Sequence, residues 1–288
     1  GPAIQTALAL DVDRLSNAEP DVRADAHDSV HQMRVATRRL RSVLRSSRKV
    51  FDRAAVDEVR DELRWLGGVL GVARDAEVRA ERFEKLLSEQ PAELVPGPIG
   101  ARLVTAQRDR YERAHAEIID ALDSERYRSL RAALDRLLDQ PPAGAAAKDP
   151  ASDVFLHALT TEYRRVRRDV RTEFAASTEH RIEALHDVRK AAKRLRYAAE
   201  AATPVLGESA DVVAKDAKAL QSVLGNHRDA VESQQAILDA AESARAAGED
   251  VFGYGLLYMA EEQAARAAIA GYQPALDTLT IACSALGS

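Results

Sequence analysis

Cysteine, aromatic residues and long apolar runs are scarce in this chain of 288 residues, and each scarcity excludes a class of protein. The single cysteine, Cys283, excludes an intramolecular disulfide and is typical of a reducing compartment. No apolar run approaches the roughly 20 residues that a membrane-spanning helix needs, and no signal peptide opens the chain. We therefore expect a cytoplasmic protein that neither forms disulfides nor enters a membrane.

Runs of alternating Val, Ile, Tyr and Thr, which would predict strands, are absent as well. The strong helix formers Ala, Leu, Arg and Glu dominate, so the expected fold is all-α. We expect helix boundaries at Pro20, Pro150, Pro204 and Gly207, and a linker over residues 140–150, which read QPPAGAAAKDP. The predicted helices cover residues 3–17, 22–50, 54–89, 98–121, 125–139, 152–175, 179–202, 208–245 and 250–285.

A segment of twelve residues occurs twice. Residues 30–41 read VHQMRVATRRLR and residues 185–196 read LHDVRKAAKRLR, with six identical positions. A second pair follows at nearly the same spacing: LGGVLGVARDA (66–76) and LQSVLGNHRDA (220–230) match at seven of eleven positions. Two matched blocks at nearly constant spacing indicate an internal duplication.

The duplication predicts a single domain over residues 1–288 that is built from two repeats. The first repeat covers residues 1–140, the linker covers residues 141–150, and the second repeat covers residues 151–288. Each repeat contains about four long predicted helices, which is the number found in an antiparallel four-helix bundle.

Positive charge is concentrated in the repeated segments, although the net charge of the chain is −5. Residues 30–50 contain seven arginines and lysines and no acid, and residues 185–199 contain five, with only Asp187 to oppose them. The local field, and not the net charge, decides which ligand a surface attracts. The two segments therefore predict an anion-binding surface.

The cations of each repeated segment fall on one side of a helix, opposite an apolar stripe. The first row spans about 21 Å at 1.5 Å per residue. Like charges three and four positions apart destabilise an isolated helix, so the rows predict a partner that supplies negative charge. The rows are His31, Arg34, Arg38, Arg41 and Arg45, with Arg39 on the flank, and His186, Arg189, Lys193 and Arg196. Because Glu200 takes the place of Arg45 in the second copy, we expect the second row to be shorter.

A third basic stripe lies in the second repeat, where Arg164, Arg167, Arg168 and Arg171 share one helix face. Its counterpart in the first repeat, residues 6–16, is not basic. The sequence therefore predicts an asymmetric binding surface.

The repeated aspartates and histidines each admit two roles. We expect Asp75 and Asp229 to hold arginines of the rows in place through charge-assisted hydrogen bonds, while their Arg neighbours add to the basic surface. His31 and His186 would either add charge below about pH 6.5 and donate hydrogen bonds to an anion, or brace a neighbouring helix.

The duplicated His-x-x-Arg-x-x-x-Arg/Lys-Arg-x-Arg helix resembles the signature of the CHAD family, the conserved-histidine α-helical domain. The matching positions are His31, Arg34, Arg38, Arg39 and Arg41, and His186, Arg189, Lys193, Arg194 and Arg196. The Leu-Gly-x-x-Arg-Asp segments at 70–75 and 224–229 fit the same family, and the resemblance covers nearly the whole chain.

This resemblance implies two pseudo-symmetric four-helix bundles with a basic cleft or pore between them, and non-catalytic binding of inorganic polyphosphate. Arginine suits phosphate because its guanidinium donates two parallel hydrogen bonds, and lysine adds a mobile point charge. The predicted polyphosphate-binding residues are His31, Arg34, Arg38, Arg39, Arg41, Arg45, Arg164, Arg168, Arg171, His186, Arg189, Lys190, Lys193, Arg194 and Arg196.

The family also carries expectations about location and neighbours. Its members often follow a triphosphate-tunnel (CYTH) domain in one polypeptide, and they are expected at polyphosphate granules in the cytoplasm. Gly1-Pro2 resembles the remnant of a protease site, so we expect the natural protein to extend upstream. Any phosphohydrolase activity is then expected outside this chain.

Other functions find less support in the sequence. It contains no G-x-x-x-x-G-K-[ST] phosphate loop, H-E-x-x-H helix or nucleophile elbow, so no enzyme is predicted. His27 and His31 have metal-ligand spacing, but Ile182 replaces His27 in the second copy, and neither a metal nor a cofactor is expected. Two alternatives remain: weak, non-specific nucleic-acid binding, which the 5% aromatic content disfavours, and binding of an acidic partner protein.

Overall fold

A computed structural model describes residues 2–46, 48–139, 144 and 148–286 of the chain. Within these residues the fold is all-α, as the composition predicts, and no strand occurs. The α-helices are α1 (Pro2–Arg23), α2 (Ser29–Ser46), α3 (Arg53–Ser88), α4 (Ala106–Asp123), α5 (Glu125–Asp139), α6 (Ala151–Phe174), α7 (Arg181–Leu206), α8 (Glu208–Ala246), α9 (Phe252–Ala270) and α10 (Tyr272–Ala285). A short 3₁₀ turn (Ala92–Leu94) and a π-helical turn (Ala101–Thr105) connect α3 to α4. None of the helices in the described ranges has the length and apolarity that crossing a membrane requires.

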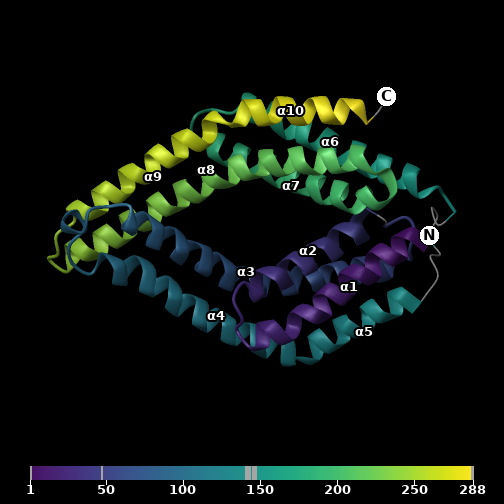
Figure 1. The fold of residues 1–288 in the computed structure, drawn as a ribbon, viewed down its shortest axis with the longest axis horizontal. Helices are drawn as coiled ribbons and strands as arrows, with labels where there is room; N and C mark the ends of the chain where they lie inside the picture. The colour runs from purple at the N-terminus through teal and green to yellow at the C-terminus, as the bar shows by residue number, and fades with distance from the viewer. Residues whose placement is uncertain (1, 47, 140–143, 145–147, 287–288) are drawn as a thin grey trace.

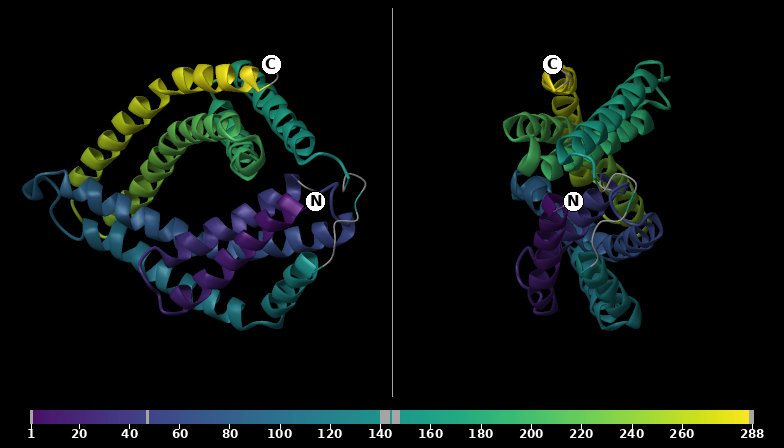
Figure 2. Two further views of the ribbon diagram at one scale, coloured as in Figure 1. Left: turned by 45° about the vertical axis from the view of Figure 1, so that its right-hand side comes forward. Right: turned by 90° about the vertical axis from the view of Figure 1, so that its right-hand side faces the viewer.

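Helices α1 to α5 form one layer and helices α6 to α10 form the other (Figure 1). The layers meet at one end of the molecule, where the α3–α4 connection lies beside the α8–α9 connection (Figure 2). They also contact each other through α2 and α7, the two helices that carry the repeated basic segment.

Apolar side chains explain both contacts between the layers. One large core cluster runs through the two layers and includes Leu40 of α2 and Leu195 of α7, which are fully buried. A smaller cluster joins the layers at the far end through Phe83, Ile237 and Leu257. Because the apolar faces of α2 and α7 are buried in the core, their opposite faces are left to carry the charged rows.

Several helix boundaries differ from those predicted. The expected helix over residues 22–50 is two helices, because α1 ends at Arg23 and a turn with positive φ at Asp25 and Asp28 precedes α2. Pro20 does not end α1, since the burial of Ala18 and Val22 on either side holds the last turn against the core. The expected helix over residues 250–285 is also divided, at Gly271.

The boundary predicted at Pro204 is wrong as well, whereas the one at Gly207 is confirmed. Pro204 lies inside α7, which continues to Leu206. Gly207 then ends the helix with a φ of 64°, a conformation that glycine adopts without a steric penalty. Most of the predicted linker, residues 140–143 and 145–147, lies outside the described residues, and α6 begins after Pro150.

Candidate anion-binding groove

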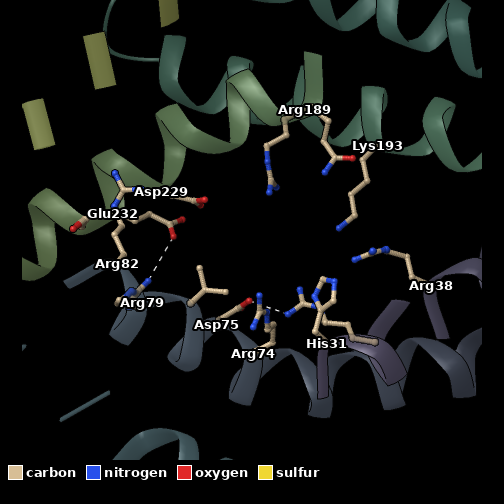
Figure 3. A pocket seen from close by; sticks show the side chains of 14 residues that line it. His31, Arg38, Arg74, Asp75, Arg79, Arg82, Arg189, Lys193, Asp229 and Glu232 are labelled. Carbon is tan, nitrogen blue, oxygen red and sulfur yellow. Dashed lines mark hydrogen bonds and ion pairs between the residues drawn. The ribbon is translucent and has the colours of Figure 1, made fainter. Parts of the chain in front are cut away.

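Two adjoining cavities lie between α2 and α3 on one side and α7 and α8 on the other. The first, which we call the His31 cavity, has a volume of about 290 Å³. It is lined by His31, Arg34, Arg38, Arg74, Asp75, Val78, Arg79, Arg82, Arg189, Lys193, Gln221, Asp229, Glu232 and Ser233. In Figure 3 the side chains of Arg189 and Lys193 point from one wall toward Arg38 and His31 on the other.

The second, the Arg194 cavity, has a volume of about 210 Å³. Among the described residues its lining contains no carboxylate and consists of Arg38, Arg41, Ser42, Arg45, Arg60, Lys190, Lys193, Arg194 and Tyr197. Because Arg38 and Lys193 line both cavities, the two are continuous, and we call them together the basic groove.

A third cavity of about 560 Å³ extends the groove at the end where Arg45 and Arg60 lie. It also contains Arg48, Lys49 and Arg165, but here acids accompany the cations: Asp149, Asp153 and Glu162. Glu162 is buried, and its carboxylate lies 3.6 Å from Nε of Arg45 and 3.2 Å from Nη1 of Arg165. We call this the Glu162 cavity. Its positive charge is partly neutralised within the fold.

Five cations of the basic groove have no acidic partner among the described residues, whereas the other arginines and lysines that line it are paired. Arg34 is paired, since its Nη1 lies 2.9 Å from Oδ1 of Asp75 and donates to the carbonyl oxygen of Gly71 at 3.2 Å. Arg38, Arg41, Arg189, Lys193 and Arg194, in contrast, form no ion pair within 4.0 Å with any carboxylate of the described residues. The side chains of Arg38 and Arg189 are half-buried, and the buried Nε of each lacks a hydrogen-bond acceptor. The groove therefore presents unused donors and uncompensated charge.

This crowding disfavours the charged forms. Burial, reinforced by neighbouring guanidinium groups, lowers the pKa of Arg38 and of Arg41, and it lowers that of Arg45 to about 10 despite Glu162. The effect is largest at Lys193, where burial first, and then Arg38 and Arg189, bring the pKa of the amine to about 7. An anion that enters the groove would relieve this repulsion.

The two repeated glycines explain how the first arginine of each row approaches the next helix. A Cβ atom on Gly71 of α3 would lie 3.6 Å from Nη1 of Arg34, and one on Gly225 of α8 would lie 3.3 Å from Nε of Arg189. Gly67 and Gly68, which stand in the first block only, do not face a neighbouring backbone. The glycine that both blocks share is thus the one that leaves room for an arginine side chain.

The two histidines of the repeat are not equivalent. His31 lines the basic groove, and burial together with the nearby Arg74 lowers its pKa. His186 lines none of the cavities described here, and the guanidinium group of Arg228 lies against its ring. Within the described residues no cluster of three or more His, Cys, Asp or Glu side chains is arranged to hold a metal.

Several predicted binding residues lie outside the groove. Arg39 lines a separate cavity on the opposite face of the α2–α7 pair, where its Nε lies 4.0 Å from Oε2 of Glu200. Arg196 lines none of the cavities described here; its Nε donates to Oε1 of the same Glu200 at 2.7 Å, and its Nη1 donates to Gln221 at 3.4 Å. Arg164, Arg168 and Arg171 are exposed on α6 and line none of the cavities described here.

Sequence reasoning missed the contribution of α3. Arg60, Arg79 and Arg82 line the cavities although they lie outside the repeated segments. A signal was present, because Gly71, Asp75, Val78 and Arg82 recur at intervals of three and four and so share one helix face. All three arginines are neutralised, since Arg82 pairs with the buried Glu261, Arg79 lies 3.6 Å from Glu232, and Nη1 of Arg60 donates to Oδ1 of Asp57 at 3.0 Å.

Comparison with known proteins relates this chain to one family and to two curated proteins. The model of the CHAD domain family matches residues 6–238. Two curated proteins of Mycobacterium tuberculosis, described as uncharacterized proteins MT2285 and Rv2226, are each 42% identical to this chain over 262 residues. These matches cover 90% of this chain and 49% of each relative, so the chain spans about half the length of the curated relatives it matches.

Two solved structures share the fold. PptA from Streptomyces chartreusis superposes with a TM-score of 0.76 at 22% identity, covering 96% of this chain and 99% of that one. The CHAD domain from the plant Ricinus communis superposes with a TM-score of 0.63 at 24% identity, covering 99% and 91% of the two chains. At these identities the likeness shows the fold alone.

Proposed function

Because this chain belongs to the CHAD domain family, we propose that its basic groove binds inorganic polyphosphate without catalysing a reaction. The observation that carries the proposal is the set of cations in the groove, Arg38, Arg41, Arg189, Lys193 and Arg194, that no carboxylate within 4.0 Å neutralises in the described residues. Side chains that served the fold alone would be paired, because an unpaired buried charge is costly.

Polyphosphate matches this groove chemically. It carries about one negative charge per phosphate and many acceptor oxygens, and arginine donates to such oxygens in pairs. A flexible linear anion can follow a groove that continues from the His31 cavity into the Arg194 cavity. Binding by five free cations releases counterions, so we expect log K to fall with log salt with a slope of about −3 to −4.

Nucleic acid is the competing polyanion, and the aromatic side chains argue against it. Single-strand binders stack bases on exposed rings. Tyr197, the one Phe, Tyr or Trp among the described residues that line the basic groove, is buried, and the guanidinium of Arg38 covers its ring at 4.8 Å from the centroid. We therefore expect nucleic acid to bind only weakly and without sequence specificity. An acidic partner protein remains the third candidate.

The role of the groove in the longer protein is part of the proposal. The curated relatives are about twice as long as the matched region, which leaves room for a further domain such as the CYTH type. Phosphohydrolase activity would belong to that part. Binding through this domain would bring the whole protein to polyphosphate granules in the cytoplasm.

Calorimetric titration with long-chain polyphosphate and with single-stranded DNA, at low and moderate salt, tests the function. We expect tight, salt-sensitive binding of polyphosphate that DNA matches only weakly, and polyphosphate should displace DNA far better than the reverse. If neither ligand binds, the groove is assigned instead to the binding of an acidic partner protein.

A charge-reversal pair tests the location. Arg34→Glu with Arg38→Glu places two acids in the His31 cavity and is expected to abolish polyphosphate binding while the circular dichroism spectrum stays helical. The matched control, Arg164→Glu with Arg168→Glu, makes the same change of charge on the exposed face of α6 and should retain binding. Equal losses in both pairs would mean that long-range charge, and not the groove, holds the ligand.

A further inference from the structure

Lys193 lies at the junction of the two halves of the basic groove. It lines both the His31 cavity and the Arg194 cavity, and Arg38 is the only other described residue that does so. Its side chain points from α7 toward Arg38 on the facing helix (Figure 3). A ligand that passes from one cavity to the other must pass this amine.

The groups that face Lys193 are mainly cationic. Helix α2 contributes Arg34, Arg38 and Arg41, and Arg189 stands one turn before Lys193 on its own helix. Helix α3 adds Arg60 in one cavity and Arg74 in the other. His31 also lines the His31 cavity, but its lowered pKa keeps it neutral at pH 7.

The carboxylates of the His31 cavity do not compensate this charge. Asp75 binds Arg34, and Glu232 binds Arg228 at 2.5 Å. Asp229 on α8 lies near Arg189 and Arg82, and burial raises its pKa. None of the three comes within 4.0 Å of the Lys193 ammonium.

Half-burial among four guanidinium groups favours the neutral amine, which is why the pKa of Lys193 falls to about 7. A polyanion in the groove reverses the local charge and restores the ammonium form. Building on the polyphosphate function proposed above, we infer that Lys193 takes up a proton when polyphosphate enters the groove, so that the site binds its ligand and a proton together. Lys193 is then a contact whose strength depends on pH, whereas the arginines around it stay charged.

The consequence is a defined pH dependence. Above about pH 7 the free amine is largely neutral and must be protonated on binding, so the affinity falls by up to tenfold for each pH unit. Below that pH the amine already carries its proton, and this dependence disappears. The terminal phosphates, with a second pKa of about 6, are fully ionised in the upper range and do not contribute there.

Calorimetry in two buffers of different ionisation enthalpy, Tris and Bicine, at about pH 8.5 measures the protons exchanged. We expect uptake of close to one proton per chain molecule with long-chain polyphosphate as the probe. Lys193→Arg keeps the charge at all pH values, so its uptake should fall close to zero and its affinity should no longer decline from pH 7 to pH 9. The matched control is Lys190→Arg, which lines the same Arg194 cavity but pairs with Asp187 at 2.5 Å and should keep the wild-type uptake.

A titration of the free protein tests the premise without any ligand. With ¹³Cε-labelled lysine, the NMR signal assigned through the Lys193→Arg variant should titrate near pH 7, well below that of Lys215, which pairs with Asp211 at 2.7 Å and whose pKa is raised. Tight binding with no proton uptake, or with the same uptake in Lys193→Arg, would overturn this inference and leave the proposed function standing. Absence of polyphosphate binding at every pH would overturn the proposed function as well.

Discussion

The α2–α7 pair has two charged faces that are built from the same residue types and differ in how the charge is compensated. On the groove face, Arg38, Arg41 and Lys193 have no carboxylate within 4.0 Å in the described residues. On the opposite face, Glu200 lies beside Arg39, and it also pairs with Arg196 of its own helix. Both faces carry cations. Among the residues that the structure describes, only the groove face has positive charge that no carboxylate neutralises. The site is therefore identified by which cations lack an ion-pair partner, and not by which residue types are present.

The residues that surround the two faces also differ in charge and polarity. The opposite face borders a cavity of about 360 Å³ whose lining includes the apolar side chains of Leu10, Val43 and Ala201. Asp11 is buried there, and desolvation raises its pKa even though Arg14 bonds to it at 2.6 Å. A polyanion would meet acids and apolar surface on this face, whereas on the groove face it meets guanidinium groups.

The largest expected contrast comes from two neighbouring arginines. Arg38→Ala removes an unpaired groove cation and should weaken polyphosphate binding roughly tenfold to a hundredfold, as the loss of about 1.5–3 kcal/mol from a charged hydrogen bond implies. Arg39→Ala, one residue along and on the opposite face, should change the affinity by about twofold or less. Titration calorimetry of both variants measures the contrast. Equal losses of affinity in the two variants would mean that both faces contribute to polyphosphate binding.

The next effect is on stability. The pKa of Lys193 is depressed to about 7 in the fold, so the unfolded chain binds more protons between about pH 7 and pH 10, and the free energy of unfolding should rise with pH in that window. Lys193→Met removes the unfavourable charge and should raise the free energy of unfolding by about 1–3 kcal/mol at pH 6.5. This is less than the full pKa shift corresponds to, because solvent screens a half-buried amine. The free energy of unfolding of this variant should no longer rise between about pH 7 and pH 10.

The control for this prediction is Lys190→Met. Lys190 is exposed and already paired with Asp187, so its replacement should change the free energy of unfolding by less than about 0.5 kcal/mol. Urea unfolding at pH 6.5 and pH 9 measures both variants. A wild-type stability that stays flat or falls with pH, while Lys193→Met behaves like Lys190→Met, would mean that Lys193 stays charged in the free protein.

Removing an acid should change binding on one face only. Glu162→Gln leaves Arg45 without its carboxylate partner and should strengthen polyphosphate binding about twofold to fivefold, at some cost in stability because Arg45 is then uncompensated. Glu200→Gln frees Arg39 on the opposite face, together with Arg196, which lines neither half of the basic groove, and should leave the affinity within about twofold of wild type. Competition with a labelled polyphosphate would rank the three proteins. A gain in Glu200→Gln equal to that in Glu162→Gln would argue for a second binding face.

The smallest expected effect concerns two helical glycines. Gly225→Ala places a methyl group 3.3 Å from Nε of Arg189, so this groove cation must shift, and polyphosphate affinity should fall by about twofold. Gly68→Ala meets nothing within 4 Å and should raise the free energy of unfolding by about 0.5–1 kcal/mol with no change in affinity. Thermal unfolding measures the stability of both variants, and titration calorimetry measures their affinity for polyphosphate. Unchanged affinity in Gly225→Ala would show that the contact at Arg189 tolerates a methyl group.

Much of the fold follows from local sequence. Helix propensity and the period of buried positions such as Leu40 and Leu195 predict an all-α chain, and most predicted helices agree with the structure to within a few residues. The errors occur where tertiary packing overrides a local signal. Proline at 20 and 204 ordinarily suggests a boundary, but buried neighbours hold both helices together through it.

The sequence by itself determined which helices carry the cations, because the repeat and its 3.6-residue period place Arg38 and Lys193 opposite the apolar stripes of their helices. Only the tertiary structure decided which cations are free. Glu200 neutralises Arg196 from the same helix but Arg39 from across an interface, and Glu162 reaches Arg45 from α6. Ion pairs between distant segments depend on how the helices pack, and periodicity along one helix does not contain that information.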